Sequence, residues 1–259
     1  MTLTPQDLDE LRAAKQILEK PSFVARVSNA VGAPLEKSFI ALPKPVTKVV
    51  GDLTETVVGK AFDSALYTLR DPKAEASSNL THKLAAMASG AVGGAFGMGA
   101  LALELPVSTT IMLRSIADIA RSEGEDLRSP EAKVQCIQVL ALGGPSKSDD
   151  AAEKGYFGAR AALAKAVSDA AKYLAAHQAG ARGAPAIVRL ITQVASRFSV
   201  VVSQKAAAQS VPLVGAFGGA TINALFIGHY QDMARGHFTV RRLERAHGAE
   251  AVRAAYEQL

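Results

Sequence analysis

The 259-residue chain has no tryptophan, one cysteine and few other aromatic residues. The single cysteine, Cys136, excludes an intrachain disulfide, and its apolar neighbours indicate a buried, unreactive thiol. Few aromatic rings are present to stack on bases, and the 29 Lys and Arg residues are interleaved with 24 acidic residues rather than gathered in a stripe. We therefore expect no nucleic-acid partner.

Other signals are also missing. The stretch MTLTPQDLDELRAAKQ at residues 1–16 has acids where a secretory signal needs bases, and it has no apolar core. No Walker A loop, GxSxG elbow or strand-borne GxGxxG occurs, and we expect no cofactor. We expect a cytoplasmic protein whose apolar segments hold it at the periphery of the inner membrane.

What the chain does have is Ala, Val and Leu at helical spacing, without alternating β-branched runs. This predicts an all-α fold, a single compact bundle of about eight to ten helices with two central glycine-rich segments. We expect one domain overall, made of N-terminal helices in 1–75 and a helical core in 76–259, with a mobile loop near 145–158. The predicted helices are Pro5–Lys20, Phe23–Val31, Val46–Leu69, Ala76–Leu103, Pro106–Arg121, Pro130–Leu142, Ala159–Ala179, Ala186–Ser210 and Pro212–Arg235.

The two glycine-rich segments carry no charge. Leu84–Leu103 contains glycines four residues apart, and Ala206–Gly228 repeats the pattern over 23 residues. Small residues at this spacing share a helix face and let another helix approach closely. Three interpretations stay open: buried helices that cross at close range, a soluble fold that inserts into or lies on a membrane, and true membrane spans. The predicted packing glycines are Gly90, Gly93, Gly94, Gly97, Gly215 and Gly219.

A charged run follows the first segment. On a helix, Glu104, Ser108, Ile111, Ser115, Asp118 and Ser122 recur at steps of three and four, and Arg114 and Arg121 can each pair with Asp118. Such a group of carboxylates and an arginine is typical of an acid–base or metal site, or of a structural ion pair with an acidic cap. The candidate catalytic residues are Glu104, Arg114, Asp118, Glu125 and Asp126, and the candidate binding residues are Arg114, Asp118, Arg121 and Asn223.

Asn223 is a lone amide in an apolar run, so burial would require a hydrogen-bond partner from another helix or a ligand. His229 and Asp232 lie three residues apart and share a helix face. Two ligands without a supporting motif make only a weak metal site, and we assign no metal.

Two blocks of the sequence resemble a known family. GAVGGAFGMGALALELPVSTTIMLRSIADIARSEGEDL looks like the central signature of the EcsC family, and PLVGAFGGATINALFIGHYQDMARGHFTVRRLE looks like its C-terminal signature. The resemblance covers about residues 75–250, and the N-terminal seventy residues are only loosely similar. It implies a bacterial helical protein, cytoplasmic or membrane-peripheral, and supplies no catalytic residues. The signature positions named here are Glu104, Pro106, Arg114, Asp118, Glu125, Asp126, Pro212, Gly215 and Asn223.

These features favour a membrane-peripheral or lipid-interacting protein that acts through helical surfaces and has a membrane surface or lipid as its partner. One alternative is a soluble hydrolase acting on lipid-like substrates, with its site around Arg114 and Asp118. A second alternative is a regulator of a membrane transporter, with a membrane protein as its partner. The sequence leaves open whether the protein is an enzyme.

Overall fold

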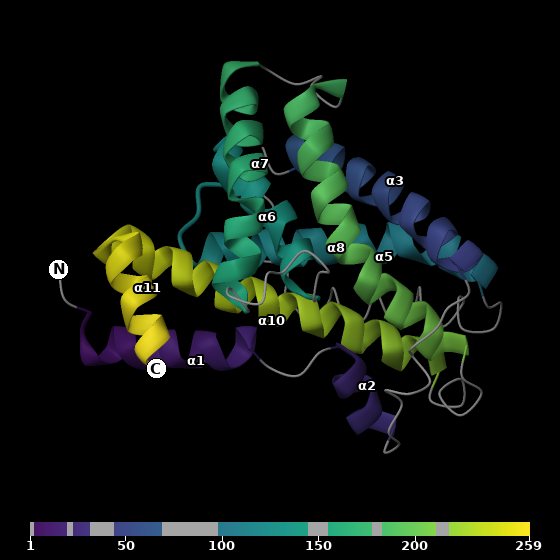
Figure 1. Cartoon of the computed structure of the whole chain (residues 1–259), viewed down its shortest axis with the longest axis horizontal. Coiled ribbons are helices and arrows are strands. Elements are labelled where there is room, and N and C mark those ends of the chain that lie inside the picture. The colour runs from purple at the N-terminus through teal and green to yellow at the C-terminus, as the bar shows by residue number, and fades with distance from the viewer. Residues whose placement is uncertain are drawn as a thin grey trace.

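The computed structural model of the chain describes residues 3–19, 23–31, 44–68, 98–144, 155–177, 183–210 and 218–259. Within these ranges every regular element is a helix, and nine helices are present (Figure 1). The predicted all-α fold is therefore confirmed. The helices are α1 (Pro5–Leu18), α2 (Phe23–Val31), α3 (Lys44–Thr68), α5 (Met98–Ser122), α6 (Pro130–Leu142), α7 (Tyr156–Ala176), α8 (Pro185–Ser210), α10 (Gly218–His247) and α11 (Ala249–Gln258).

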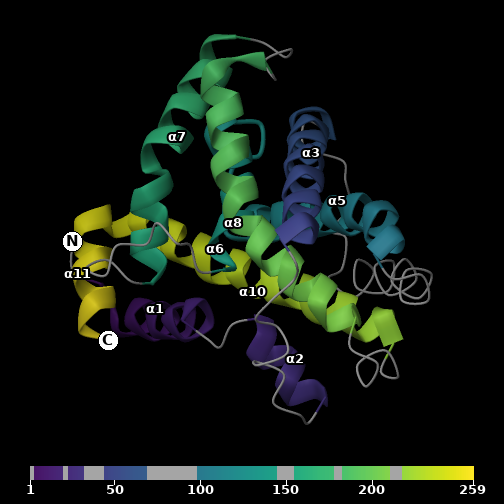
Figure 2. The same ribbon diagram turned by 45° about the vertical axis from the view of Figure 1, so that its right-hand side comes forward.

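The long helix α10 runs through the centre of the bundle. It packs against α1 along one side and against α5 and α6 on another, and α11 folds back beside it (Figure 1). Helices α7 and α8 rise together from this base, and α3 lies against α8 and α5 (Figure 2). A continuous apolar core joins residues from α2 to α10, so the N-terminal helices pack on the C-terminal half of the chain.

Two helix starts follow the cap signals in the sequence. Thr4 caps α1 through a reciprocal box, in which Asp7 N–H donates to Thr4 Oγ1 at 3.2 Å and Thr4 N–H donates to Asp7 Oδ2 at 2.8 Å. Ser129 caps α6, where it accepts from Ala132 N–H at 3.1 Å, and Pro130 occupies the first helical position. Each cap satisfies backbone donors that the first helical turn cannot pair.

Part of the predicted mobile loop is helical. Residues 145–154 lie outside the described residues, but Tyr156–Gly158 form the first turn of α7, three residues before the predicted start. Tyr156 is buried against Phe157 and Tyr256, and this aromatic packing stabilises a turn that local sequence gave no reason to expect. The prediction of a loop was therefore wrong at this end, and α7 ends earlier than predicted, at Ala176.

Pro106 does not end a helix. The sequence predicts a helix break or a kink near Pro106, and the break is wrong, because α5 is a single helix from Met98 to Ser122 with Pro106 inside it. An internal proline costs a helix about 3 kcal/mol through the lost N–H and a steric clash. Leu105 and Met112, on either side of the proline, are fully buried, so core packing offsets that cost.

The two ends of the second uncharged segment belong to described helices. Its first residues form the end of α8 at Ser210, as predicted, and its last residues form the start of α10 from Gly218. Helix α10 then continues twelve residues past the predicted end at Arg235, because Phe238, Val240 and Leu243 are buried. Residues 211–217 lie outside the described residues.

The proposed close packing of glycines falls largely outside the described residues. Gly90, Gly93, Gly94, Gly97 and Gly215 all lie there, and Gly219 lies in the first turn of α10. The described part of the chain does contain one glycine of this kind. A Cβ on Gly236 would lie 2.6 Å from Leu18 Cγ, so this glycine allows α1 and α10 to cross closely.

Candidate functional site

A buried polar cluster joins three helices. Lys205 of α8 donates through its ammonium group to Glu104 Oε1 of α5, and it donates to Asn223 Oδ1 of α10 at 2.8 Å. Gln209, one turn further along α8, donates to the other oxygen of Glu104 at 3.2 Å. The Lys205 ammonium also lies 4.5 Å from the centre of the Phe226 ring, a cation–π contact.

Burial sets the electrostatics of this cluster. Lys205 and Asn223 are fully buried and Glu104 is 4% exposed, so water does not solvate the charges. Burial lowers the pKa of Lys205 below its ordinary 10.5, and the opposite charge of Glu104 offsets part of that shift. An ion pair in such surroundings is stabilised only while both partners and their additional hydrogen bonds are in place.

The position of the cluster in the sequence is informative. Glu104 directly follows the uncharged segment Leu84–Leu103, Lys205 directly precedes the uncharged segment Ala206–Gly228, and Asn223 lies within the latter. Both segments therefore join the described helices at one buried ion pair. We call Glu104, Lys205 and Asn223 the anchor cluster.

Sequence reasoning found two of the three members of the anchor cluster. It singled out Glu104 and Asn223, which are 119 residues apart, but not their shared partner, and it treated Lys205 only as a flanking charge. A lone cation at position 205, between the apolar residues Val202 and Ala206, was the available signal. A buried Lys in such surroundings requires an acid, and Glu104 occupies the same kind of surroundings.

The structure does not gather the five predicted catalytic residues at one place. Asp118 lies fourteen residues along α5 from Glu104, about 21 Å at 1.5 Å per residue. Asp118 forms an ion pair with Arg121 at 3.3 Å, whereas Arg114 is exposed. A single acid–base site therefore cannot use Glu104 and Asp118 together.

Glu125 and Asp126 are adjacent but differ in environment. The side chain of Glu125 is 6% exposed and accepts from Arg241 at 2.8 Å and from Arg245, both on α10. Arg241 also bonds Glu131 of α6 at 3.1 Å. Asp126 is exposed and pairs with Arg128, whose hydrogen bonds lower the pKa of Asp126. Glu125 thus links the end of α5 to α10, as an acidic cap that fixes a neighbouring helix.

His229 and Asp232 have separate partners. His229 Nε2 lies 2.6 Å from the carbonyl oxygen of Gly143, and burial lowers the pKa of His229 to about 4. Asp232 pairs with Arg26 at 2.7 Å and with Arg235 at 2.6 Å. Across the described ranges, no three His, Cys, Asp or Glu side chains come close enough to hold a metal ion.

The thiol of Cys136 matches the sequence prediction. Cys136 lies in α6 and is fully buried, and burial raises its pKa to about 12. A thiol in such surroundings carries almost no thiolate at neutral pH and is a poor nucleophile.

One helix in the described part of the chain is long and apolar enough to cross a membrane by length and composition alone. It covers Pro185–Gln209 in α8, with a mean hydropathy of 1.4, and half of its most apolar stretch is buried inside the bundle. Thr192 and Ser196 lie on its exposed side, whereas Leu190 and Val194 are buried. This distribution is typical of a core helix in a helical bundle.

Comparison with protein families places most of the chain in one of them. The profile of the EcsC protein family matches residues 5–243. The match begins 85 residues before the first signature block, which starts at Gly90, and it includes α1, α2 and α3. No curated protein and no solved structure matches the chain.

Proposed function

The chain belongs to the EcsC protein family, and we propose that it is a membrane-peripheral protein that acts through helical binding surfaces rather than through an active site. The observation that carries the proposal is the anchor cluster. It joins by buried hydrogen bonds three residues that flank or lie within the two uncharged segments of the sequence.

The physical argument starts from the composition of these segments. Leu84–Leu103 and Ala206–Gly228 have no charged side chain, so contact with a lipid surface costs no desolvation of charge. Apolar area removed from water contributes about 25 cal/mol per Å². The net charge of +5 adds attraction to anionic lipids, of about 1 kcal/mol for each Lys or Arg near the surface.

The anchor cluster holds together the helices that flank the two uncharged segments. A segment that contacts lipid gains affinity only if the rest of the chain keeps its fold, and the buried pair of Glu104 and Lys205 holds α5 and α8 together beside both segments. Asn223 ties α10 to the same point. The helices beyond the cluster then act as a rigid body that carries the segments.

The test is co-sedimentation of the detergent-free full chain with vesicles. Neutral phosphatidylcholine vesicles are compared with vesicles that contain phosphatidylglycerol, at low salt and at about 0.5 M salt, where charge attraction is largely screened. We expect binding to anionic vesicles, with a fraction that survives high salt because it is apolar. A matched variant, Phe96→Glu, places a charge in the first segment and should lose the salt-resistant fraction.

A control separates apolar insertion from general surface charge. Phe157→Glu adds the same charge on α7 and should leave the salt-resistant fraction unchanged. Absence of binding to both vesicle types at every salt concentration would overturn the proposal. Equal losses in Phe96→Glu and Phe157→Glu would assign the binding to overall charge instead.

A further inference from the structure

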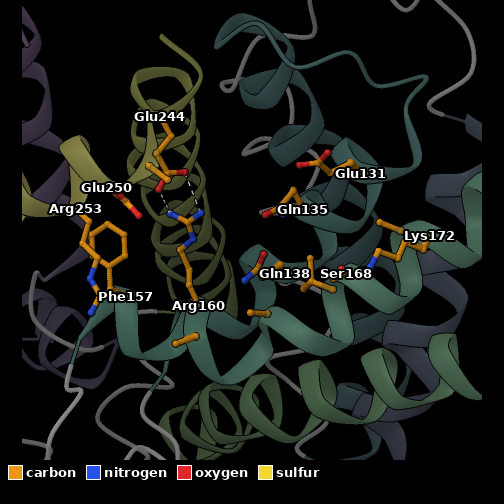
Figure 3. A pocket seen from close by; sticks show the side chains of 15 residues that line it. Glu131, Gln135, Gln138, Phe157, Arg160, Ser168, Lys172, Glu244, Glu250 and Arg253 are labelled. Atoms are coloured by element: carbon orange, nitrogen blue, oxygen red, sulfur yellow. Dashed lines mark hydrogen bonds and ion pairs between the residues drawn. The ribbon is translucent and has the colours of Figure 1, made fainter. Parts of the chain in front are cut away.

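A pocket of about 660 Å³ lies between α6, α7, α10 and α11, apart from the residues of the anchor cluster. Figure 3 shows its side chains, with those of α6 facing those of α7 across the space. Its volume is within the range of specific ligand sites. None of its lining residues belongs to the anchor cluster or to the uncharged segments.

The pocket contains two buried amides from α6. Gln135 and Gln138 are one helical turn apart and only 7% and 2% exposed, yet both line the pocket. Gln138 forms no hydrogen bond with any residue in the described ranges. The Gln138 amide lines the pocket and is not among the buried side-chain atoms cut off from water, so it is reached from the pocket. This amide is therefore available to a ligand.

A chain of hydrogen bonds determines which group of the Gln135 amide is left to bind a ligand. Arg160 donates to Tyr156 Oη at 3.2 Å, Tyr156 Oη lies 2.9 Å from His237 Nδ1, and His237 Nε2 lies 3.0 Å from Gln135 Oε1. Arg160 can only donate, and Tyr156 has one proton. Every donor finds an acceptor when Tyr156 donates to Nδ1 and Nε2 donates to Gln135. The Gln135 NH₂ group then remains to donate to a ligand.

The charged residues at the rim differ between the two ends of the pocket. Arg160 is paired with Glu244 at 2.7 Å, Glu131 with Arg241, and Arg253 with Glu257. Lys172 and Glu250 also line the pocket, and neither forms an ion pair with a described residue. In Figure 3 these two lie at opposite ends, with Glu250 beside Arg253 and Phe157.

The length of the pocket limits the ligand. Phe157 and Lys172 are fifteen residues apart on α7, about 22 Å at 1.5 Å per residue. About six residues of extended chain, at about 3.4 Å each, cover this length. The wall between the ends is made of small apolar side chains, Ala161, Ala164, Val167 and Ala171.

We propose that this pocket is a docking groove for an extended peptide of about six residues, with a cationic end at Glu250 and an anionic end at Lys172. The backbone amides of the peptide pair with Gln135 and Gln138, since a glutamine amide offers the same donor and acceptor as a peptide group. A zwitterionic lipid headgroup fits less well, because its two charges are adjacent rather than about 20 Å apart. The groove is independent of the proposed membrane contact.

The experiment compares two pools of blocked hexapeptides on the immobilised full chain. One pool has Arg first and Glu last with four random central positions, and the other has Ala at both ends of the same random positions. Mass spectrometry measures how much of each pool is retained. Because each charged end adds one rim ion pair, we expect the wild type to favour the charged pool by about three- to fivefold.

The double variant Lys172→Ala with Glu250→Ala should lose the preference for the charged pool, and Gln138→Leu should reduce retention of both pools. A control exchange on α3, Lys48→Glu with Asp52→Lys, keeps the same net charge and should leave the preference unchanged. None of these variants should change vesicle binding, so failure here is distinct from failure of the membrane proposal.

Equal retention of the two pools by the wild type, or retention of neither pool, would overturn the peptide groove. Retention of short-chain phosphatidylcholine that is lost in Gln138→Leu, without peptide retention, would assign the pocket to a lipid and would also overturn it.

Discussion

Removing one partner of the anchor cluster should destabilise the protein far more than removing both. In Lys205→Met, Glu104 keeps only the hydrogen bond from Gln209 and becomes an uncompensated buried carboxylate. In Glu104→Gln, Lys205 keeps Asn223 and the Phe226 ring but loses its counter-charge. Single removal from a buried pair costs about 3–5 kcal/mol, a large share of the 5–15 kcal/mol that stabilises a typical domain.

The double variant Glu104→Leu with Lys205→Met replaces the pair by apolar side chains. It should be about 1–2 kcal/mol less stable than wild type, because Asn223 Oδ1 still loses a donor. In the cycle of wild type, Glu104→Leu, Lys205→Met and their double variant, the coupling energy should then exceed about 2 kcal/mol. Urea unfolding followed by circular dichroism at helix wavelengths measures all four free energies.

The pH dependence gives a second readout of the same pair. The pKa of Lys205 in the folded protein lies below its value of 10.5 in the unfolded chain. At a pH between these two pKa values the unfolded chain binds more protons, so the free energy of unfolding rises with pH. Glu104→Gln lowers that pKa further and extends this range to lower pH. The stability gap between Glu104→Gln and wild type should therefore narrow between pH 7 and 10. Single variants that each cost less than about 1 kcal/mol and add in the double variant would refute the reasoning.

Three further predictions use the same unfolding assay. Glu125→Gln should cost about 2–3 kcal/mol, because the Glu125 carboxylate is buried and loses charge-assisted hydrogen bonds from Arg241 and Arg245. Asp126→Asn next to it should hardly shift the urea midpoint, and equal effects would contradict the burial difference. Gly236→Ala should cost about 1–3 kcal/mol through its clash with α1, whereas Gly228→Ala in the same helix has open space and should gain about 0.5–1 kcal/mol. His229 has a pKa of about 4 in the folded protein and 6.5 in the unfolded chain, so the unfolded chain binds the proton first as the pH falls. The free energy of unfolding should therefore fall by about 2 kcal/mol between neutral pH and pH 5, and His229→Gln should remove this part of the pH dependence.

Local signals predicted the elements that local interactions determine. The capping residues Thr4 and Ser129 marked two helix starts, and the boundaries of Phe23–Val31 agree with α2. The EcsC resemblance was also confirmed, since it rested on long blocks of ordered residues rather than on spacing alone. For the helix boundaries, the residues that determine each start or end lie within a few positions of it in the sequence.

The sequence could not reveal features that depend on distant partners. At the end of α10, Arg241 and Arg242 pair with Glu125, Glu123 and Glu10, which lie more than a hundred residues earlier. Lys205 was missed as a site residue for the same reason. The pocket was missed as well, because it is built from four helices and its two glutamines have no motif.

The most direct test of the membrane proposal uses the absence of tryptophan. Phe96→Trp gives the full chain a single tryptophan in the first uncharged segment, and Phe157→Trp gives a matched one on α7. Both are mixed with phosphatidylglycerol vesicles that contain brominated lipid, at about 0.5 M salt. The account predicts quenching and a blue shift of emission for Phe96→Trp and neither change for Phe157→Trp. Emission from Phe96→Trp that is the same with and without vesicles would contradict it.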